Sequence, residues 1–165
     1  MPSRFLTAML ARLNGRLALI DCGEGTQVTM KMLGWGFKAI DVICFTHFHA
    51  DHISGLPGLL LTIGNAGRTE PLTLIGPVGL QRIVEGLTLI APELPFPIEY
   101  IELTQDAPNP ISVGAFEIHH CPADHMVKCF AYRIDLKRKG KFDVKKAGRL
   151  KLPKPLWNKL QKEGS

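Results

Sequence analysis

The sequence has few cysteines and no long apolar segment. Only four of its 165 residues are cysteine, and no two stand in a Cys-x-x-Cys pair, which favours free thiols over a disulfide framework. No uninterrupted apolar run reaches the roughly eighteen residues of a membrane-spanning helix. The apolar stretch 5–20 is interrupted by Arg12, Asn14 and Arg16, and no signal-peptide cleavage pattern follows it. We therefore expect a cytoplasmic protein without a membrane partner.

Four potential metal ligands follow directly after an apolar run. The run 41–45 is typical of a strand buried on both faces, and the next residues read Thr-His-Phe-His-Ala-Asp-His. Open α/β sheets place their ligand sites at the carboxyl ends of strands. His47 and His49 are one residue apart, so both imidazoles can converge on one cation in an extended turn. Asp51 and His52 point to a second position.

These residue types indicate hydrolytic metal chemistry. Neutral imidazole and carboxylate are the ligands expected for zinc, although manganese and iron also fit. Two such metals, about 3.5–4 Å apart, would lower the pKa of a water between them. An isolated histidine is more often structural than a ligand. Burying three imidazoles and a carboxylate without a cation is costly, however, so the complete motif favours a metal site.

The apolar pattern predicts strands and helices in alternation, followed by antiparallel strands. This order suits one half of an αββα sandwich. Leu56, Leu59, Leu60 and Ile63 recur at helical spacing and predict one buried helix face. We expect helices over 26–33, 53–63 and 78–90, and strands over 16–21, 41–45, 72–75, 98–103, 111–120 and 128–134.

Three further segments have recognisable motifs. Residues 19–27 read Leu-Ile-Asp-Cys-Gly-Glu-Gly-Thr-Gln, a strand end and tight turn; His125 precedes Phe-Ala-Tyr-Arg; and residues 140–160 form a basic segment rich in glycine and proline. Together with the histidine motif, they resemble the metallo-β-lactamase superfamily and, more narrowly, the ribonuclease Z family of tRNA 3′-processing endonucleases. The resemblance runs from about Arg4 to the last residues. Ala131 stands where that family usually has glycine.

The resemblance implies the fold and its division into parts. It predicts an α/β protein with a metallo-β-lactamase-like αββα sandwich, apparently truncated to about its first half. Residues 1–136 would form the N-terminal half of that fold. Residues 137–165 would begin the flexible arm with which the family grips tRNA.

The resemblance also implies two zinc ions per complete site. It assigns His47, His49 and His125 to the first zinc, and Asp51 and His52 to the second. Asp51 would also orient the attacking water and act as general base. The family takes a bridging aspartate and further histidines from its second half, whereas this chain has no histidine after His125. We therefore expect an incomplete enzyme.

Charge is distributed unevenly along the chain. Residues 1–127 hold seven Lys and Arg against twelve Asp and Glu, whereas residues 128–165 hold thirteen against three. Such asymmetry indicates a polyanion partner for the basic end, although a solvated tail of ordinary lysines is an alternative. The candidate RNA-binding residues are Lys137, Arg138, Lys139, Lys141, Lys145 and Lys146.

The expected function is zinc-dependent endoribonuclease activity that removes 3′ trailers from precursor tRNA, with the complete protein pairing as a homodimer. Two alternatives remain open. One is another hydrolase of the superfamily that acts on a small ester, and the other is a non-catalytic tRNA-binding half-enzyme. The first predicts no role for the basic end; the second predicts that replacing Asp51 has no effect.

Several neighbouring residues are expected to have structural roles. Asp21 should form hydrogen bonds with the metal histidines rather than bind metal. His119 and His120 face opposite ways on a strand, and we expect both to be structural. Cys121 and Cys129 flank His125 and are expected to be buried structural cysteines rather than soft metal ligands or a disulfide.

Overall fold

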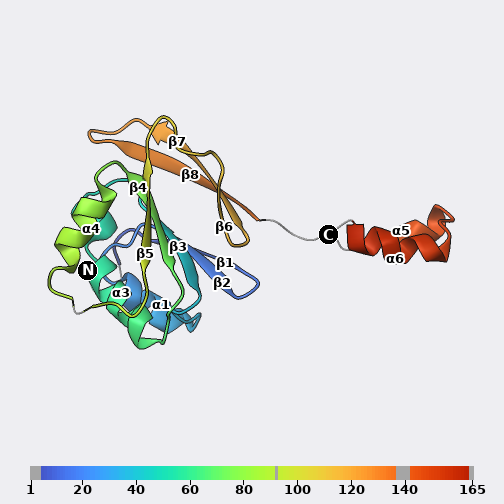
Figure 1. Cartoon of the computed structure of the whole chain (residues 1–165), viewed down its shortest axis with the longest axis horizontal. Coiled ribbons are helices and arrows are strands. Elements are labelled where there is room, and N and C mark those ends of the chain that lie inside the picture. The colour runs from blue at the N-terminus through green and yellow to red at the C-terminus, as the bar shows by residue number, and fades with distance from the viewer. Residues whose placement is uncertain (1–4, 92, 137–141, 164–165) are drawn as a thin grey trace. The chain divides into compact units, whose positions relative to one another are not determined.

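The computed structural model describes residues 5–91, 93–136 and 142–163 (Figure 1). The chain divides into two compact units, Met1–Asp135 and Leu136–Ser165. In the residues that the structure describes, the first unit contains two β-sheets with helices, and the second contains two helices. Among the described residues, no helix combines the length and the apolar character that crossing a membrane would need.

The larger sheet has five strands in the order β1-β2-β3-β4-β5. β1 and β2 form an antiparallel hairpin, and the following strands pair in parallel. The hairpin turn is Asn14-Gly15, with φ of 49° and 81°, as two-residue hairpins prefer. β1 is not among the predicted strands, although Asn-Gly is a typical sequence signal of a hairpin turn. The strands are β1 Met9–Leu13, β2 Arg16–Ile20, β3 Ile40–Cys44, β4 Leu72–Pro77 and β5 Ile98–Leu103.

The described part of the first unit has four helices. The predicted buried face of α3 is confirmed, since Leu56, Leu59, Leu60 and Ile63 are all fully buried against the large sheet. Each such side chain contributes about 1.5–3 kcal/mol through burial. The helices are α1 Thr26–Leu33, α2 Ala50–Ile53, α3 Leu56–Asn65 and α4 Leu80–Thr88.

The single helix predicted over 53–63 is wrong at its start. The chain instead breaks between α2 and α3, where the Gly55 amide donates to the Cys22 carbonyl at 2.9 Å. A Cβ on Gly55 would collide with the backbone of Gly23. The break therefore exists because two backbone segments, distant in sequence, approach too closely for any side chain.

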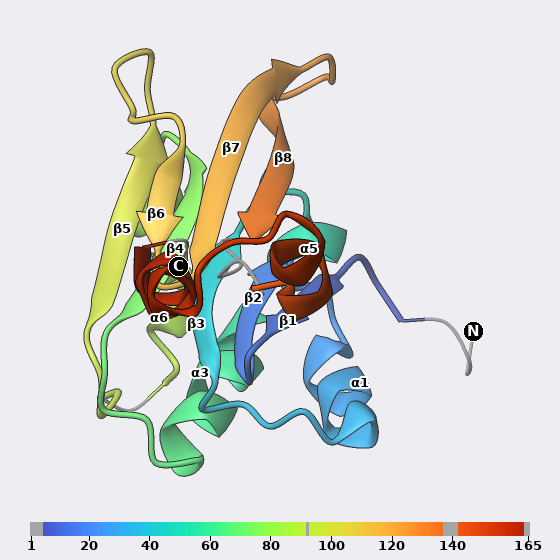
Figure 2. The same cartoon turned by 90° about the vertical axis from the view of Figure 1, so that its right-hand side faces the viewer.

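The second sheet has three strands in the order β6-β7-β8 (Figure 2). They are β6 Ile111–Val113, β7 Phe116–Ala123 and β8 Cys129–Leu136. The single strand predicted over 111–120 is thus two strands, because Gly114 turns the chain at φ 57°. The Phe130 amide donates to the Thr46 carbonyl at 2.9 Å, which joins the start of β8 to the histidine loop.

The second unit contains α5 Val144–Arg149 and α6 Lys154–Glu163, neither of which the sequence prediction included. Asp143 caps α5 by accepting a hydrogen bond from the Lys146 amide at 2.9 Å. The rings of Phe142 and Trp157 lie 5.7 Å apart, and the Trp157 indole donates to the Leu152 carbonyl at 2.9 Å. These contacts join the two helices.

Gly55→Ala should destabilise the protein by about 3 kcal/mol, because the added methyl group must displace the Gly23 backbone. Gly86→Ala is the matched control. Gly86 is exposed inside α4 with no atom within 4 Å of a new Cβ, so this change should stabilise the helix by about 0.5–1 kcal/mol. Urea unfolding followed by circular dichroism measures both. Equal effects of the two variants would contradict the close approach.

Candidate metal centre

The histidine motif lies at the carboxyl end of β3, near the middle of the large sheet. The Phe45 amide donates to the Ile75 carbonyl at 2.7 Å, so the strand remains attached to β4 up to the motif. His49 then has extended backbone angles and begins α2, where the His52 amide donates to its carbonyl at 2.9 Å. This strand–loop–helix turn places the four motif side chains within one short segment.

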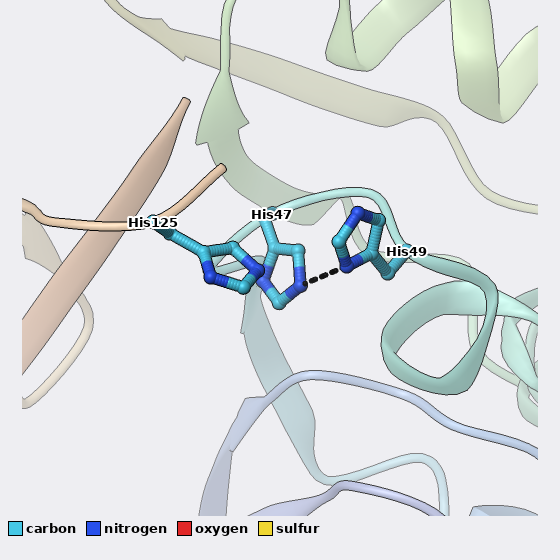
Figure 3. Close-up of side chains that lie close together, drawn as sticks. All are labelled: His47, His49 and His125. Atoms are coloured by element: carbon cyan, nitrogen blue, oxygen red, sulfur yellow. Dashed lines mark hydrogen bonds between the residues drawn. The ribbon is translucent and has the colours of Figure 1, made fainter. Parts of the chain in front are cut away.

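Three histidines converge on one point, as Figure 3 shows. One ring nitrogen from each of His47, His49 and His125 lies within 4.8 Å of the others. His47 Nε2 is 3.0 Å from His49 Nδ1, and the His125 ring centroid is 4.6 Å from that of His47. His125 comes from the loop between β7 and β8, so the two sheets both contribute.

Burial favours the neutral form of His47. The residue is only 5% exposed, and this burial is the main cause that lowers the pKa of its imidazole below 6.5. The neighbouring His52, His49 and His125 lower the pKa further. A neutral imidazole carries the lone pair that a metal ligand requires.

The chemistry of this donor set fits a divalent cation such as zinc. Three imidazoles from a loop and a neighbouring hairpin are a ligand set typical of catalytic zinc sites, which leave a position open for water or substrate. The structure brings together the three histidines that the family resemblance assigns to one metal. Their occupancy by zinc stays a prediction.

Asp51 and His52 form a neighbouring pair. Asp51 Oδ2 is 3.6 Å from His52 Nε2, and the Asp51 side chain is 56% exposed. A carboxylate and an imidazole in this arrangement offer two ligand atoms for a second cation. The His52 ring centroid is 4.1 Å from that of His47, so this pair adjoins the three-histidine cluster, and its assignment to a second metal likewise stays a prediction.

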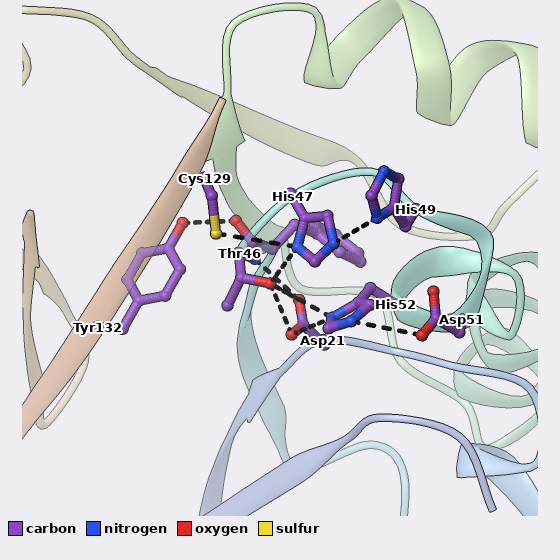
Figure 4. Close-up of polar contacts among 9 residues, drawn as sticks. Asp21, Thr46, His47, His49, Asp51, His52, Cys129 and Tyr132 are labelled. Carbon is purple, nitrogen blue, oxygen red and sulfur yellow. Dashed lines mark hydrogen bonds and ion pairs between the residues drawn. The ribbon is translucent and has the colours of Figure 1, made fainter. Parts of the chain in front are cut away.

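Asp21 and Thr46 hold two of the histidines in place (Figure 4). Asp21 Oδ2 lies 2.8 Å from His52 Nδ1, which confirms the predicted hydrogen bond between Asp21 and a motif histidine. The Thr46 hydroxyl lies 2.9 Å from both Asp21 Oδ2 and His47 Nδ1. The Nδ1 atoms of His47 and His52 therefore have hydrogen-bond partners, and the Nε2 atoms, which face His49 and Asp51, are the ones that can bind a metal.

Sequence reasoning did not identify Thr46 as a functional residue. The signal was weak, since a threonine at a strand end is usual, and its role depends on Asp21 at the end of another strand. Asp21 is 2% exposed and has a φ of 58°, unusual for a residue other than glycine. Its carboxylate accepts from the Thr46 amide at 2.8 Å, which holds this backbone conformation.

The structure agrees only in part with the predictions for the cysteines and histidines near His125. The expected burial of Cys121 is wrong: this thiol is exposed because it lies on an uncovered part of β7. Cys129 is half-buried, with its sulfur 4.0 Å from His47 Nδ1. His119 lies 3.1 Å from the Asp135 carboxylate, and His120 lies 3.1 Å from the Pro108 carbonyl, so neither belongs to the three-histidine cluster, and their structural roles stay predictions.

The candidate RNA-binding residues belong to the second unit. Lys145 and Lys146 are exposed on α5. The other four, Lys137, Arg138, Lys139 and Lys141, lie outside the described residues.

Comparisons with known proteins agree with this geometry. Over 161 residues the chain is 56% identical to a ribonuclease Z from Lachnospira eligens, covering 98% of this chain and 53% of that protein. A ribonuclease Z from Clostridium kluyveri is 57% identical with the same coverage. The crystal structure of human tRNase Z, short form, matches with a TM-score of 0.71 and 28% identity, over 82% of this chain and 60% of that one. The chain thus spans about half the length of the curated relatives it matches.

The expected fold and the resemblance to ribonuclease Z are both confirmed. The model of the metallo-beta-lactamase superfamily matches residues 4–133, a segment that includes the large sheet, the small sheet up to the middle of β8, and all three converging histidines. The chain belongs to the metallo-β-lactamase superfamily.

Proposed function

We propose that this chain carries the metal-binding part of a zinc-dependent endoribonuclease that removes 3′ trailers from precursor tRNA. The observation that supports the proposal is the convergence of His47, His49 and His125 within 4.8 Å. The substrate class is supported by similarity to proteins named ribonuclease Z. Because the chain spans about half the length of these relatives, activity is proposed for the protein in its native form.

His47, His49 and His125 would hold one zinc, and Asp51 with His52 would contribute to a second. Zinc, when bound, polarises a phosphoryl oxygen and makes water more acidic, which is the chemistry that phosphodiester hydrolysis needs. The hydrogen bonds of the His47 ring with Thr46 and of the His52 ring with Asp21 keep these two rings oriented, so that binding costs little rotational entropy.

Asp51 is the proposed general base. Its carboxylate is exposed enough to meet water and lies 3.6 Å from His52, whose ring is held on its other side by Asp21. Asp51 would orient a water for attack on phosphorus and accept its proton.

The proposal extends to partners and location. The exposed Lys145 and Lys146 would contact the phosphate backbone of precursor tRNA, adding affinity without reading sequence. The cytoplasm is proposed because all four cysteines are free thiols. A homodimer is proposed from the family resemblance alone.

His49→Ala and His125→Ala should each weaken zinc binding by at least about 100-fold, because each removes one of three converging ligands. His119→Ala is the matched control, since this histidine contacts Asp135 instead. Competition with a chromophoric chelator measures the affinities. Unchanged zinc affinity in both ligand variants would contradict the metal site.

The double variant Lys145→Ala/Lys146→Ala should weaken binding of precursor tRNA. It should also reduce the slope of log affinity against log salt by about 1 for each phosphate interaction that the change removes. Fluorescence anisotropy with labelled precursor tRNA provides both numbers. The control is Lys31→Ala/Lys38→Ala, which removes the same charge from exposed positions of the first unit. A solvated tail without RNA contacts predicts identical curves for the two double variants.

Asp51→Asn should lower the rate of trailer removal by about 100-fold or more, because the amide cannot accept the proton from water. The assay uses the native protein with zinc and precursor tRNA labelled in its trailer. The tRNA product should end in a 3′-hydroxyl. Asp106→Asn, at an exposed position outside the centre, is the control. Hydrolysis of a small ester with precursor tRNA left intact would instead support the alternative hydrolase.

A further inference from the structure

Two cavities adjoin the histidine cluster, and Lys128 lines both. The larger, about 1090 Å³, also includes His125 in its wall. The smaller, about 190 Å³, includes His49. Among the described residues that line either cavity, Lys128 is the single lysine or arginine. A positive charge therefore stands where the two cavities meet, beside two of the three converging histidines.

The position of Lys128 is fixed by its neighbours in sequence. It lies between His125 and the start of β8. The next residue, Cys129, places its sulfur 4.0 Å from His47 Nδ1, and the Phe130 amide donates to the Thr46 carbonyl at 2.9 Å. Two successive residues thus attach the backbone of this segment to the histidine loop, and Lys128 is the residue directly before them.

No opposite charge neutralises this ammonium in the described part of the chain. Lys128 is exposed and has no hydrogen-bond or ion-pair partner there. No carboxylate is among the described residues that line the two cavities. Lys128 is also the first residue of the basic segment 128–165. A cation without a charged partner among the described residues, beside the three histidines, is therefore a local site of attraction for an anion.

The walls around Lys128 are largely apolar. Leu103, Met126, Val127 and Phe130 line the larger cavity, and Phe48 lines the smaller. Apolar and aromatic surfaces accept the flat faces of bases without regard to sequence, and a nearby cation accepts the phosphate. This combination suits one unit of a single-stranded RNA, whereas a small neutral ester would leave the ammonium unused.

We propose that Lys128 is a substrate-binding residue that holds a phosphate of the RNA strand next to the phosphodiester at the histidine cluster. The proposal rests on the proposed function and adds a contact at the metal centre, separate from the basic residues of the second unit. Lys128 would therefore position the strand for cleavage, while the second unit adds affinity elsewhere on the RNA.

The test measures binding of a fluorescein-labelled uridine tetranucleotide to the zinc-loaded full chain by anisotropy over a range of salt. Lys128→Met keeps the length of the side chain and removes its charge. It should weaken binding roughly 3- to 10-fold at low salt and flatten the slope of log affinity against log salt by about 0.7, the value for one phosphate of a single strand. Lys128→Arg should retain most of the affinity.

Two controls separate this proposal from the proposed function. Lys31→Met removes the same charge from an exposed position on α1 and should leave binding unchanged. His49→Ala should weaken tetranucleotide binding if the RNA lies at the histidine cluster. Wild-type affinity in Lys128→Met, together with weaker binding in His49→Ala, would overturn the role of Lys128 and leave the proposed function standing. If the full chain bound neither zinc nor the tetranucleotide, both the role of Lys128 and the proposed function would be overturned.

Discussion

The buried carboxylate of Asp21 is the constraint on which the arrangement of the centre depends. It lies at the end of β2 and receives hydrogen bonds from the Thr46 amide and hydroxyl at the end of β3. The same carboxylate accepts a hydrogen bond from His52 in α2. A carboxylate excluded from water must satisfy its oxygens within the protein. These hydrogen bonds hold the ends of the parallel strands β2 and β3 together. They thereby position the histidine loop, which begins at Thr46.

Much of the first unit could be predicted because local pattern and tertiary structure agree there. The apolar run before the histidine motif became β3, and the spacing of Leu56, Leu59, Leu60 and Ile63 gave a buried helix face. The convergence of His125 with His47 and His49 could not come from spacing, since His125 belongs to the second sheet. The family resemblance supplied it, because homologous folds preserve contacts that lie far apart in sequence.

The missed features depend on partners that are distant in sequence. The break at Gly55 exists because the Cys22–Gly23 backbone occupies the space that a continuous helix would need. Thr46 gains its role from Asp21, and an isolated threonine gives no hint of it. The helices of the second unit were missed for another reason. Their basic, proline-containing sequence reads as a loop, whereas the Asp143 cap and the Phe142–Trp157 contact favour helices.

The three converging histidines are supplied by two different sheets, so a bound metal would affect how those sheets unfold. His47 and His49 follow a strand of the large sheet, whereas His125 lies in the hairpin of the small one. A cation shared by all three would act as a cross-link between the sheets, and its binding energy would add to the cooperativity of the unit. Opening of the small sheet alone would then require release of the metal, a coupling that amide hydrogen exchange in β7 and β8 would register as added protection.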